Sequence, residues 1–163
     1  MTTGFAQGHV MYLAWKFVHL AGVVLLVGNV TITAIWKVFA DRTGEPKTIA
    51  FAQRMVNGTD WVCTGGGILL IVAGGYGMAA SAGLNIVTTR WLLWGQILFV
   101  LSGILWLCVL VPLQIRQARL AAVFAQGGPI PDAYRNLSAR WLVWGIAATV
   151  PLVAALFVMI AKP

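Results

Sequence analysis

The chain has little charge and few of the residues from which catalytic or metal sites are usually built. Only 9% of its 163 residues are charged, four residues are acidic, and there are two histidines and two cysteines. Soluble globular domains carry about 25% charged residues, which argues against a water-soluble fold. Paired carboxylates and a Ser, His, Asp set suited to hydrolysis are also lacking, which argues against a hydrolase.

The cysteines and the positive net charge have simple interpretations. Cys63 and Cys108 lack the spacing of a metal motif, and we interpret both as buried apolar residues. The net charge is +7, but no basic and aromatic face remains outside the apolar stretches. No nucleic-acid partner is therefore expected.

What the chain does have is long apolar runs, with 60% hydrophobic residues and a mean hydropathy of +0.88. About 20 apolar residues in a helix cross ~30 Å of hydrocarbon. Four stretches qualify as spans, at about 12–35, 61–81, 91–114 and 141–161. They predict an all-α polytopic protein, an antiparallel four-transmembrane-helix bundle that forms a single membrane domain over 1–163 in the lipid bilayer. The first 15 residues hold no Lys or Arg, so no cleaved signal peptide is expected.

The connections between the spans are short. "GEPK" and "NGTD" are turn signals that flank a short amphipathic helix predicted over 48–56. Residues 82–90 form a tight connection, and 115–139 extend span three before breaking at "GGPIP". Asp60 and Asp132 fit helix caps.

Basic residues predict the orientation. The first and third connections share a face and hold eight of the eleven: Lys37, Arg42, Lys47, Arg54, Arg116, Arg119, Arg135 and Arg140. The opposite side has Arg90, Lys162 and Lys16. The positive-inside rule then places these two connections in the cytoplasm and both termini outside, in an inner (cell) membrane.

The hexapeptides "RWLLWG" at 90–95 and "RWLVWG" at 140–145 lie on opposite sides of the membrane in this topology. Downstream the two segments hardly match, which argues against a true repeat. Arg90 and Trp94, like Arg140 and Trp144, share a helix face, where the guanidinium reaches the headgroups beside the indole. We interpret both hexapeptides as interface anchors, with ligand contact as the alternative.

Polar residues within the spans are the candidates for chemistry, because each is costly in a bilayer. Span one carries them at spacings of three and four, which places them on one helix face that must contact protein. The polar residues of this face are Lys16, His19, Asn29, Thr33 and Lys37, and Gly22 and Leu26 complete the same face.

His19 has three interpretations. It is a neutral imidazole bonded to another span, an axial ligand to a b-type haem, or a proton-relay or copper ligand. The other histidine, His9, is ten residues away and off the same helix face, so one helix cannot present both to one metal. Lys16, one turn before His19, either snorkels outward or serves as a ligand or proton carrier.

Span two contributes glycines and span three contributes one amide side chain, that of Gln96. "TGGGILLIVAGGYG" places glycines where helices pack closely, or alternatively where a planar macrocycle finds a flat slot. Gln96 in span three is predicted to hydrogen-bond across to His19. The candidate cofactor-binding residues are thus His19, Gln96, Lys16 and Asn29, with His19 as the metal ligand.

The first span, "WKFVHLAGVVLLVGNVTITAIWK", resembles that of small bacterial four-helix membrane proteins related to the copper-resistance D protein and the haem-b-dependent, J-type protoporphyrinogen oxidase. The nearest likeness is to a family of predicted integral membrane proteins within this group. This likeness rests on two motifs in span one and one in span four. They are "H-x-x-G" at His19 and Gly22, "G-N" at Gly28 and Asn29, and the "RW" that opens span four.

The resemblance implies a haem ligated by His19. In the J-type oxidases this histidine is paired with a Lys in a later span, whereas "RWLLWGQ" has Gly95 and Gln96 in that region. Protoporphyrinogen oxidation is therefore not supported, and neither is copper transport, because no Met or His cluster lines a span.

Two functions remain open at this point, and the sequence does not decide whether the chain is an enzyme. The first is haem b binding through His19 for electron transfer or oxidation chemistry, with Gln96 or an external ligand opposite and quinone as a redox partner. The second is a non-catalytic subunit or assembly partner, in contact with other membrane subunits or as a homo-oligomer.

Overall fold

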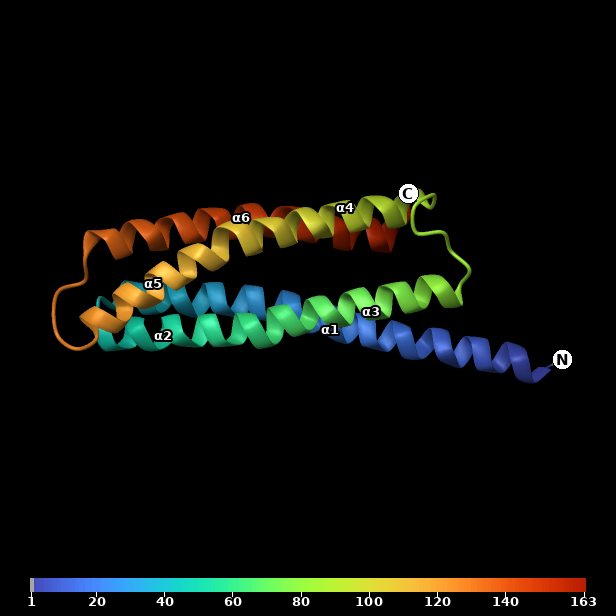
Figure 1. The fold of residues 1–163 in the computed structure, drawn as a ribbon, viewed down its shortest axis with the longest axis horizontal. Helices are drawn as coiled ribbons and strands as arrows, with labels where there is room; N and C mark the ends of the chain where they lie inside the picture. The colour runs from blue at the N-terminus through green and yellow to red at the C-terminus, as the bar shows by residue number, and fades with distance from the viewer. Residues whose placement is uncertain (1) are drawn as a thin grey trace. The chain divides into compact units, whose positions relative to one another are not determined.

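The computed structural model describes residues 2–163, with side chains from residue 8 onward, and every regular element in that range is helical. Figure 1 labels the main helices. The elements are α1 (Thr2–Thr43), α2 (Pro46–Thr59), η1 (Asp60–Gly65), α3 (Gly66–Ser81), α4 (Arg90–Leu105), η2 (Trp106–Leu110), α5 (Val111–Phe124) and α6 (Asp132–Ala161).

Four stretches of the described chain are long and apolar enough to cross a membrane. They are Gly8–Thr43, Pro46–Ser81, Arg90–Phe124 and Asp132–Ala161. Each holds one of the four apolar stretches recognised in the sequence, and each extends beyond it. The predicted fold class, all-α with four membrane-crossing helices, is confirmed.

Two π-helical turns, η1 and η2, join α2 to α3 and α4 to α5 without a chain reversal. The amphipathic helix predicted over 48–56 exists, but the turn predicted at "NGTD" is wrong. Asn57 accepts a 3.0 Å hydrogen bond from the Nε2 of Gln53 one turn earlier, and Asp60 is buried. A π turn takes up an additional residue while helical hydrogen bonding continues.

Three non-helical connections separate the helical stretches. Gly44 has φ +68° between α1 and α2, and Gly83 has φ +64° after α3. In the latter connection the side chain of Asn85 accepts hydrogen bonds from the backbone N–H groups of Val87 and Thr88. Gly127 and Gly128 also have positive φ. The tight connection after span two and the break at "GGPIP" are therefore confirmed, because these glycines adopt conformations that other residues avoid.

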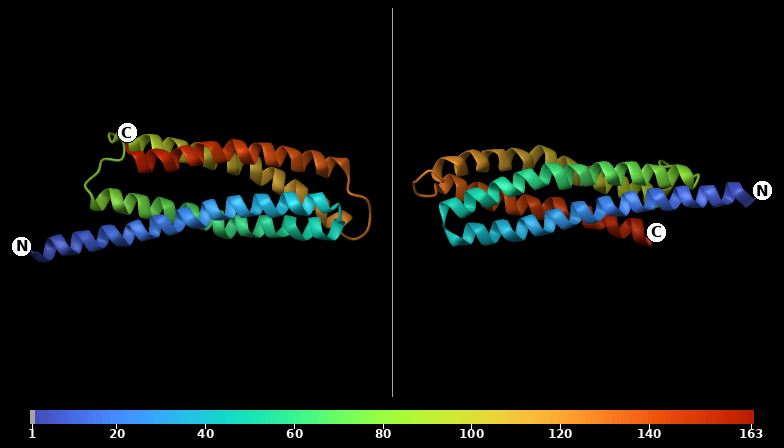
Figure 2. Two further views of the ribbon diagram at one scale, coloured as in Figure 1. Left: turned by 180° about the vertical axis from the view of Figure 1, so that it is seen from behind. Right: turned by 90° about the horizontal axis from the view of Figure 1, so that it is seen from below.

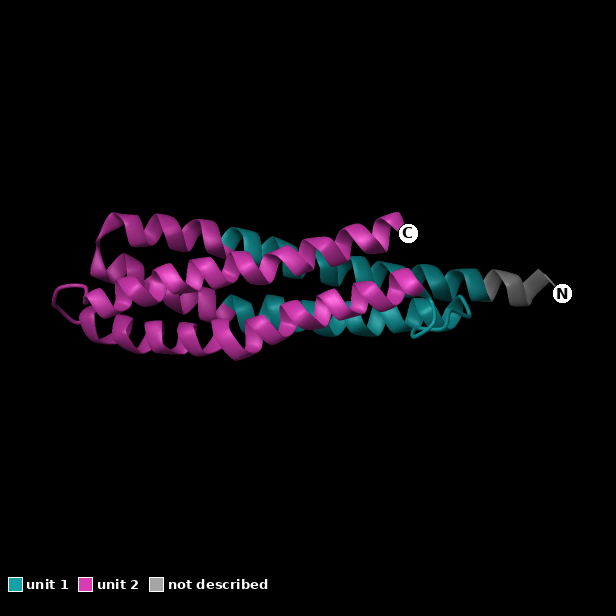
Figure 3. Cartoon of the chain, turned by 90° about the horizontal axis from the view of Figure 1, so that it is seen from above, with its two compact units in different colours: residues 1–32, 59–89 teal, residues 33–58, 90–163 magenta. Residues whose placement is uncertain are grey.

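The described chain forms two compact units (Figure 3). The first unit consists of the described residues up to Ile32 together with Thr59–Thr89, and the second of Thr33–Gly58 and Arg90–Pro163.

Close helix packing builds the first unit. A Cβ on Gly22 would lie 2.8 Å from the carbonyl oxygen of Gly67, and a Cβ on Gly67 would lie 2.9 Å from the Cβ of Leu26. A Cβ on Gly74 would overlap the backbone nitrogen of His19, and one on Gly77 would overlap the ring of Trp15. The packing interpretation of the span-two glycines is thus confirmed for Gly67, Gly74 and Gly77, because α1 itself covers them.

The second unit is built around α4, α5 and α6, and α4 and α6 lie side by side in the views of Figures 1 and 2. The hydroxyl of Ser102 on α4 donates to the carbonyl oxygen of Ala148 on α6 at 2.8 Å. Two hydrophobic clusters form its core. One holds Ile49, Ala50, Ala121, Phe124 and Tyr134, and the other holds Val56, Leu110, Leu113, Trp141 and Ala148.

Candidate functional site

His19 is held against α3 by a hydrogen bond within the first unit. Its Nδ1 lies 2.8 Å from the carbonyl oxygen of Ile71. A carbonyl oxygen only accepts, so Nδ1 carries the proton and donates it. The absence of a Cβ at Gly74 lets the two backbones approach closely enough for this contact. The half-buried imidazole is therefore fixed in one tautomer, and Nε2 is the nitrogen that retains a lone pair for a ligand or a proton.

The polar face predicted on the first span is largely confirmed. Leu26, Asn29, Thr33 and Lys37 are all buried, as is the backbone at Gly22. Lys16 is exposed, in accord with the outward orientation weighed for it. The inward-facing part of the face therefore begins at His19 and extends to the cytoplasmic end predicted for the helix.

Asn29 lies in a buried polar contact of the first unit. Its Nδ2 donates to the Oδ1 of Asp60 at 2.7 Å and to the hydroxyl oxygen of Thr64 at 3.0 Å. Asp60 is 6% exposed and lies in η1. The helix-cap interpretation of Asp60 is therefore wrong, because a buried carboxylate within a continuous helix is satisfied by side chains of its surroundings instead of an exposed helix end.

Asp132 opens α6, but the helix begins without a side-chain capping bond, so the cap interpretation is wrong here too. The carboxylate is 98% exposed and lies 4.0 Å from the Nε of Arg135. Such an exposed ion pair contributes little to stability.

Gln96 belongs to the second unit, whereas His19 belongs to the first. The amide Nε2 of Gln96 donates to the carbonyl oxygen of Leu92, one turn earlier on α4, at 3.1 Å. Its hydrogen bond to His19 stays a prediction. Cys63 is half-buried and Cys108 is exposed, so the interpretation of Cys108 as a buried residue is wrong.

The two hexapeptides differ in their surroundings. Trp94 and Trp144 are exposed, as interface anchors are expected to be, and their anchoring role stays a prediction. Trp141, by contrast, is buried, and the Nζ of Lys37 lies 5.6 Å from its ring centroid. The near-identical "RWLVWG" thus contributes one of its tryptophans to the core of the second unit.

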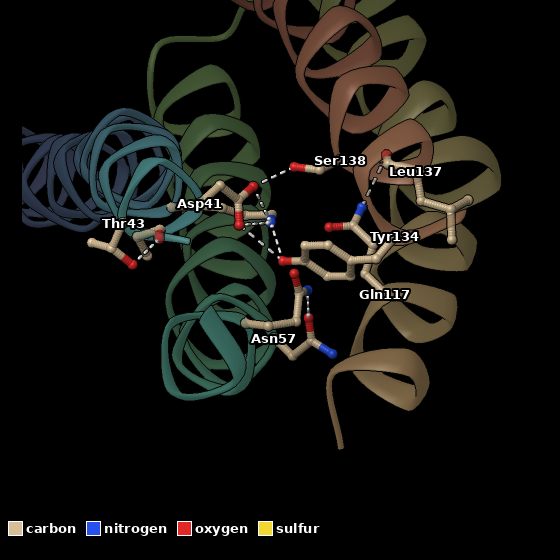
Figure 4. Close-up of polar contacts among 10 residues, drawn as sticks. Asp41, Thr43, Asn57, Gln117, Tyr134, Leu137 and Ser138 are labelled. Atoms are coloured by element: carbon tan, nitrogen blue, oxygen red, sulfur yellow. Dashed lines mark hydrogen bonds and ion pairs between the residues drawn. The ribbon is translucent and has the colours of Figure 1, made fainter. Parts of the chain in front are cut away.

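A buried ionic cluster in the second unit, shown in Figure 4, was not anticipated from the sequence. The Nζ of Lys37 donates to the carboxylate of Asp41 at 3.0 Å and to the hydroxyl of Tyr134, also at 3.0 Å. Tyr134 in turn donates to Asp41 at 2.9 Å, and Ser138 donates to the same carboxylate. The spacing of Lys37 and Asp41, four apart on one helix, was a visible signal. Nothing local connects them to Tyr134 or Ser138, which lie on α6.

Among the residues that the structure describes, no group of three or more His, Cys, Asp or Glu side chains could hold a metal ion. Residues 13–163 match the model of a family described as "Predicted integral membrane protein (DUF2269)". No curated protein and no solved structure matches the chain.

Proposed function

We propose that this chain, which belongs to the DUF2269 family of predicted integral membrane proteins, binds one haem b through His19 within the membrane. The observation that carries the proposal is the 2.8 Å hydrogen bond between the Nδ1 of His19 and the carbonyl oxygen of Ile71. It supports a ligand role because it orients the ring and leaves Nε2 for a metal.

The surroundings of His19 fit a histidine that would hold a haem. Metal-binding histidines commonly donate their second ring N–H to a carbonyl or carboxylate, which fixes the tautomer and raises the basicity of the ligating nitrogen. The carbonyl oxygen of Ile71 is such an acceptor, and the tight packing at Gly74 restricts movement of the helix that carries His19. Histidine is also the usual proximal ligand of haem in proteins.

The remaining residues have supporting roles in this proposal. When bound, haem b would supply one-electron transfer, with quinone as a redox partner that is soluble in the bilayer. His19 would hold the haem and an external molecule would supply any further ligand, whereas the part predicted for Gln96 stays a prediction. Asn29 already donates to Asp60 and Thr64, so its contribution is to hold α1 against η1. Lys16 is exposed and is the least suited of the four candidates to bind the cofactor.

The absorption spectrum of the detergent-purified protein, oxidised and reduced, tests the proposal. The parent protein, expressed with ample haem supply, is expected to show a Soret band and an α band. His19→Ala should abolish both. His9→Ala is the matched control, because His9 is the only other histidine and is exposed on the same helix.

Two results would contradict the haem proposal. One is a featureless parent spectrum after expression with ample haem. The other is a pair of bands that survives His19→Ala but is lost in His9→Ala. A haem that remains in His19→Ala with a shifted spectrum would show that another residue supplies the ligand.

A second candidate function is a non-catalytic subunit or assembly partner of a larger membrane complex. The observation that favours it is that some glycines on the crossing helices face open space. A Cβ on Gly28, Gly103 or Gly145 would have nothing within 4 Å. Such positions allow another membrane helix to approach closely, from a homo-oligomer or another subunit.

Native mass spectrometry from mild detergent separates the two candidates. A partner role predicts masses above that of one 17.5 kDa chain, and Gly28→Leu or Gly145→Leu should reduce them. A single chain with no additional protein would count against a partner role. A mass increment of one haem on that single chain would favour the first candidate.

A further inference from the structure

A polar layer crosses the interior of the second unit between its two hydrophobic clusters. On α2, Gln53 lies between Ile49 of one cluster and Val56 of the other. On α5, Gln117 lies between Leu113 and Ala121 in the same way. The layer is therefore bounded by apolar side chains on both sides.

Three side chains of this layer are fully buried, whereas Asp41 at its edge is 23% exposed. Gln53 and Gln117 are 0% exposed, and Lys37 is 1% exposed. With Tyr134 they are among the largest fully buried side chains of the described chain. Lys37 and Tyr134 are hydrogen-bonded to each other and to Asp41, so the ionic part of the layer is satisfied and has no net charge.

Three buried polar atoms in the interior of the second unit have no hydrogen-bond partner among the described residues. They are the Oε1 of Gln53, the Oε1 of Gln117 and the Nε1 of Trp141. The Nε2 atoms of the two glutamines are engaged, with Asn57 at 3.0 Å and with the carbonyl oxygen of Leu137 at 3.2 Å. Buried polar groups in proteins nearly always have a partner, and ordered water supplies it when protein atoms do not.

Both glutamines are connected to the surroundings of Trp141 by contacts of their own helices. The amide of Gln117 is bonded to Leu137, which lies one turn before Trp141 on α6. Val56 follows Gln53 by one turn on α2 and packs in the same cluster as Trp141. The Nζ of Lys37 lies 5.6 Å from the centroid of the Trp141 ring. Figure 4 shows the Gln117 amide directed toward the cluster of Asp41 and Tyr134.

We propose that an ordered water molecule is bound in this layer, donates to the Oε1 atoms of Gln53 and Gln117, and accepts from the Nε1–H of Trp141. The two amide oxygens need hydrogen-bond donors and the indole N–H needs an acceptor. A water molecule has two donor hydrogens and an acceptor oxygen, so it can satisfy all three. Buried waters typically make about three hydrogen bonds of this kind. The site is separate from His19 and independent of the haem proposal.

Ions fit the three atoms less well than water. A metal cation would face the indole N–H of Trp141 and the ammonium of Lys37, which both repel it. An anion cannot donate to two amide oxygens, and Asp41 already neutralises Lys37. A neutral donor and acceptor avoids both conflicts, and the water then joins α2, α5 and α6 through one bridging molecule.

Hydroxyl-radical footprinting by X-ray radiolysis of the full-length protein in detergent tests this site, because radicals form from bound water beside the residues that it contacts. Trp141 is 6% exposed and should nonetheless be oxidised. The double variant Gln53→Leu/Gln117→Leu removes both acceptors without adding a radical-reactive thioether and should lower the oxidation rate at Trp141 about fivefold, since the water loses two of its three partners. Trp144, exposed on the same helix, is the control and should be unchanged.

An equal oxidation rate at Trp141 in the parent and the double variant would overturn the proposal. A second measurement covers a double variant that fails to fold. In the parent protein with ¹⁵N-labelled tryptophan, the Nε1–H of Trp141 should show a magnetisation-transfer peak to water, assigned through its loss in Trp141→Phe. The lack of that peak would also overturn the proposal.

Discussion

The Nζ of Lys37 and the hydroxyl oxygen of Tyr134 lie 3.0 Å apart, although 97 positions separate the two residues in the chain. The contact joins the end of α1 to the start of α6. It lies next to Asp41, which accepts hydrogen bonds from both side chains. A lysine that is 1% exposed thereby keeps its charge balanced within an apolar environment.

Removing the ammonium should be strongly destabilising. Lys37→Met leaves the Asp41 carboxylate without its cation, and breaking a buried ion pair from one side costs about 3 kcal/mol. The midpoint of thermal unfolding in detergent, followed by tryptophan fluorescence, measures this effect. Lys47→Met, at an exposed lysine of α2, is the control and should unfold like the parent.

The double variant Lys37→Met/Asp41→Leu checks the cause of that loss. Removing both charges leaves no uncompensated carboxylate, so the double variant should be more stable than Lys37→Met alone. A double variant that is less stable by the sum of the two single effects would contradict the ion-pair explanation.

Tyr134→Phe should also lower the unfolding midpoint. It removes the hydroxyl that accepts from Lys37 and donates to Asp41, and hydrogen bonds to charged groups contribute about 1.5–3 kcal/mol. The ring remains, together with its edge-to-face contact with Phe124 at 5.2 Å between centroids. Tyr12→Phe, at a half-buried tyrosine of α1, is the control. Equal midpoints for the two variants would show that the hydroxyl of Tyr134 is dispensable.

Gly74→Ala should separate α1 from α3 in the first unit. The new Cβ would overlap the backbone of His19, and overpacking of this kind costs about 1–3 kcal/mol. Gly28→Ala is the matched control, since a Cβ there has nothing within 4 Å, and alanine is favoured over glycine in a helix by about 1 kcal/mol. Thermal unfolding should therefore shift down for Gly74→Ala only. A reversed order would contradict the close packing at Gly74.

Reporter fusions check the predicted orientation in the membrane. Alkaline phosphatase inserted after Asn85, in the connection between α3 and α4, should be active because this connection is expected outside the cytoplasm. Inserted after Gly127, between α5 and α6, it should be inactive, since the basic residues near that connection favour the cytoplasm. Activity at Gly127 and none at Asn85 would invert the topology.

Much of the fold could be predicted from the residues alone, because the signals are local. Apolar runs of helical length identify the four crossing helices, and spacings of three and four identify the buried face that contains Asn29 and Lys37. The prediction at Asp60 was wrong because it, too, relied on local composition alone. "NGTD" has the composition of a turn, but a buried contact with Asn29 makes the helix continue, and that contact involves a residue 31 positions away.

The amino-acid sequence by itself determined that the chain is an all-helical membrane protein with four crossing helices, because hydrophobicity and helical periodicity depend on near neighbours. It also singled out His19 as the intramembrane histidine. Only the tertiary structure decided which nitrogen of His19 is occupied, that α1 covers the span-two glycines, and that Lys37 meets Tyr134. These properties depend on which segments, distant in the chain, pack together. The local amino-acid composition does not determine that packing.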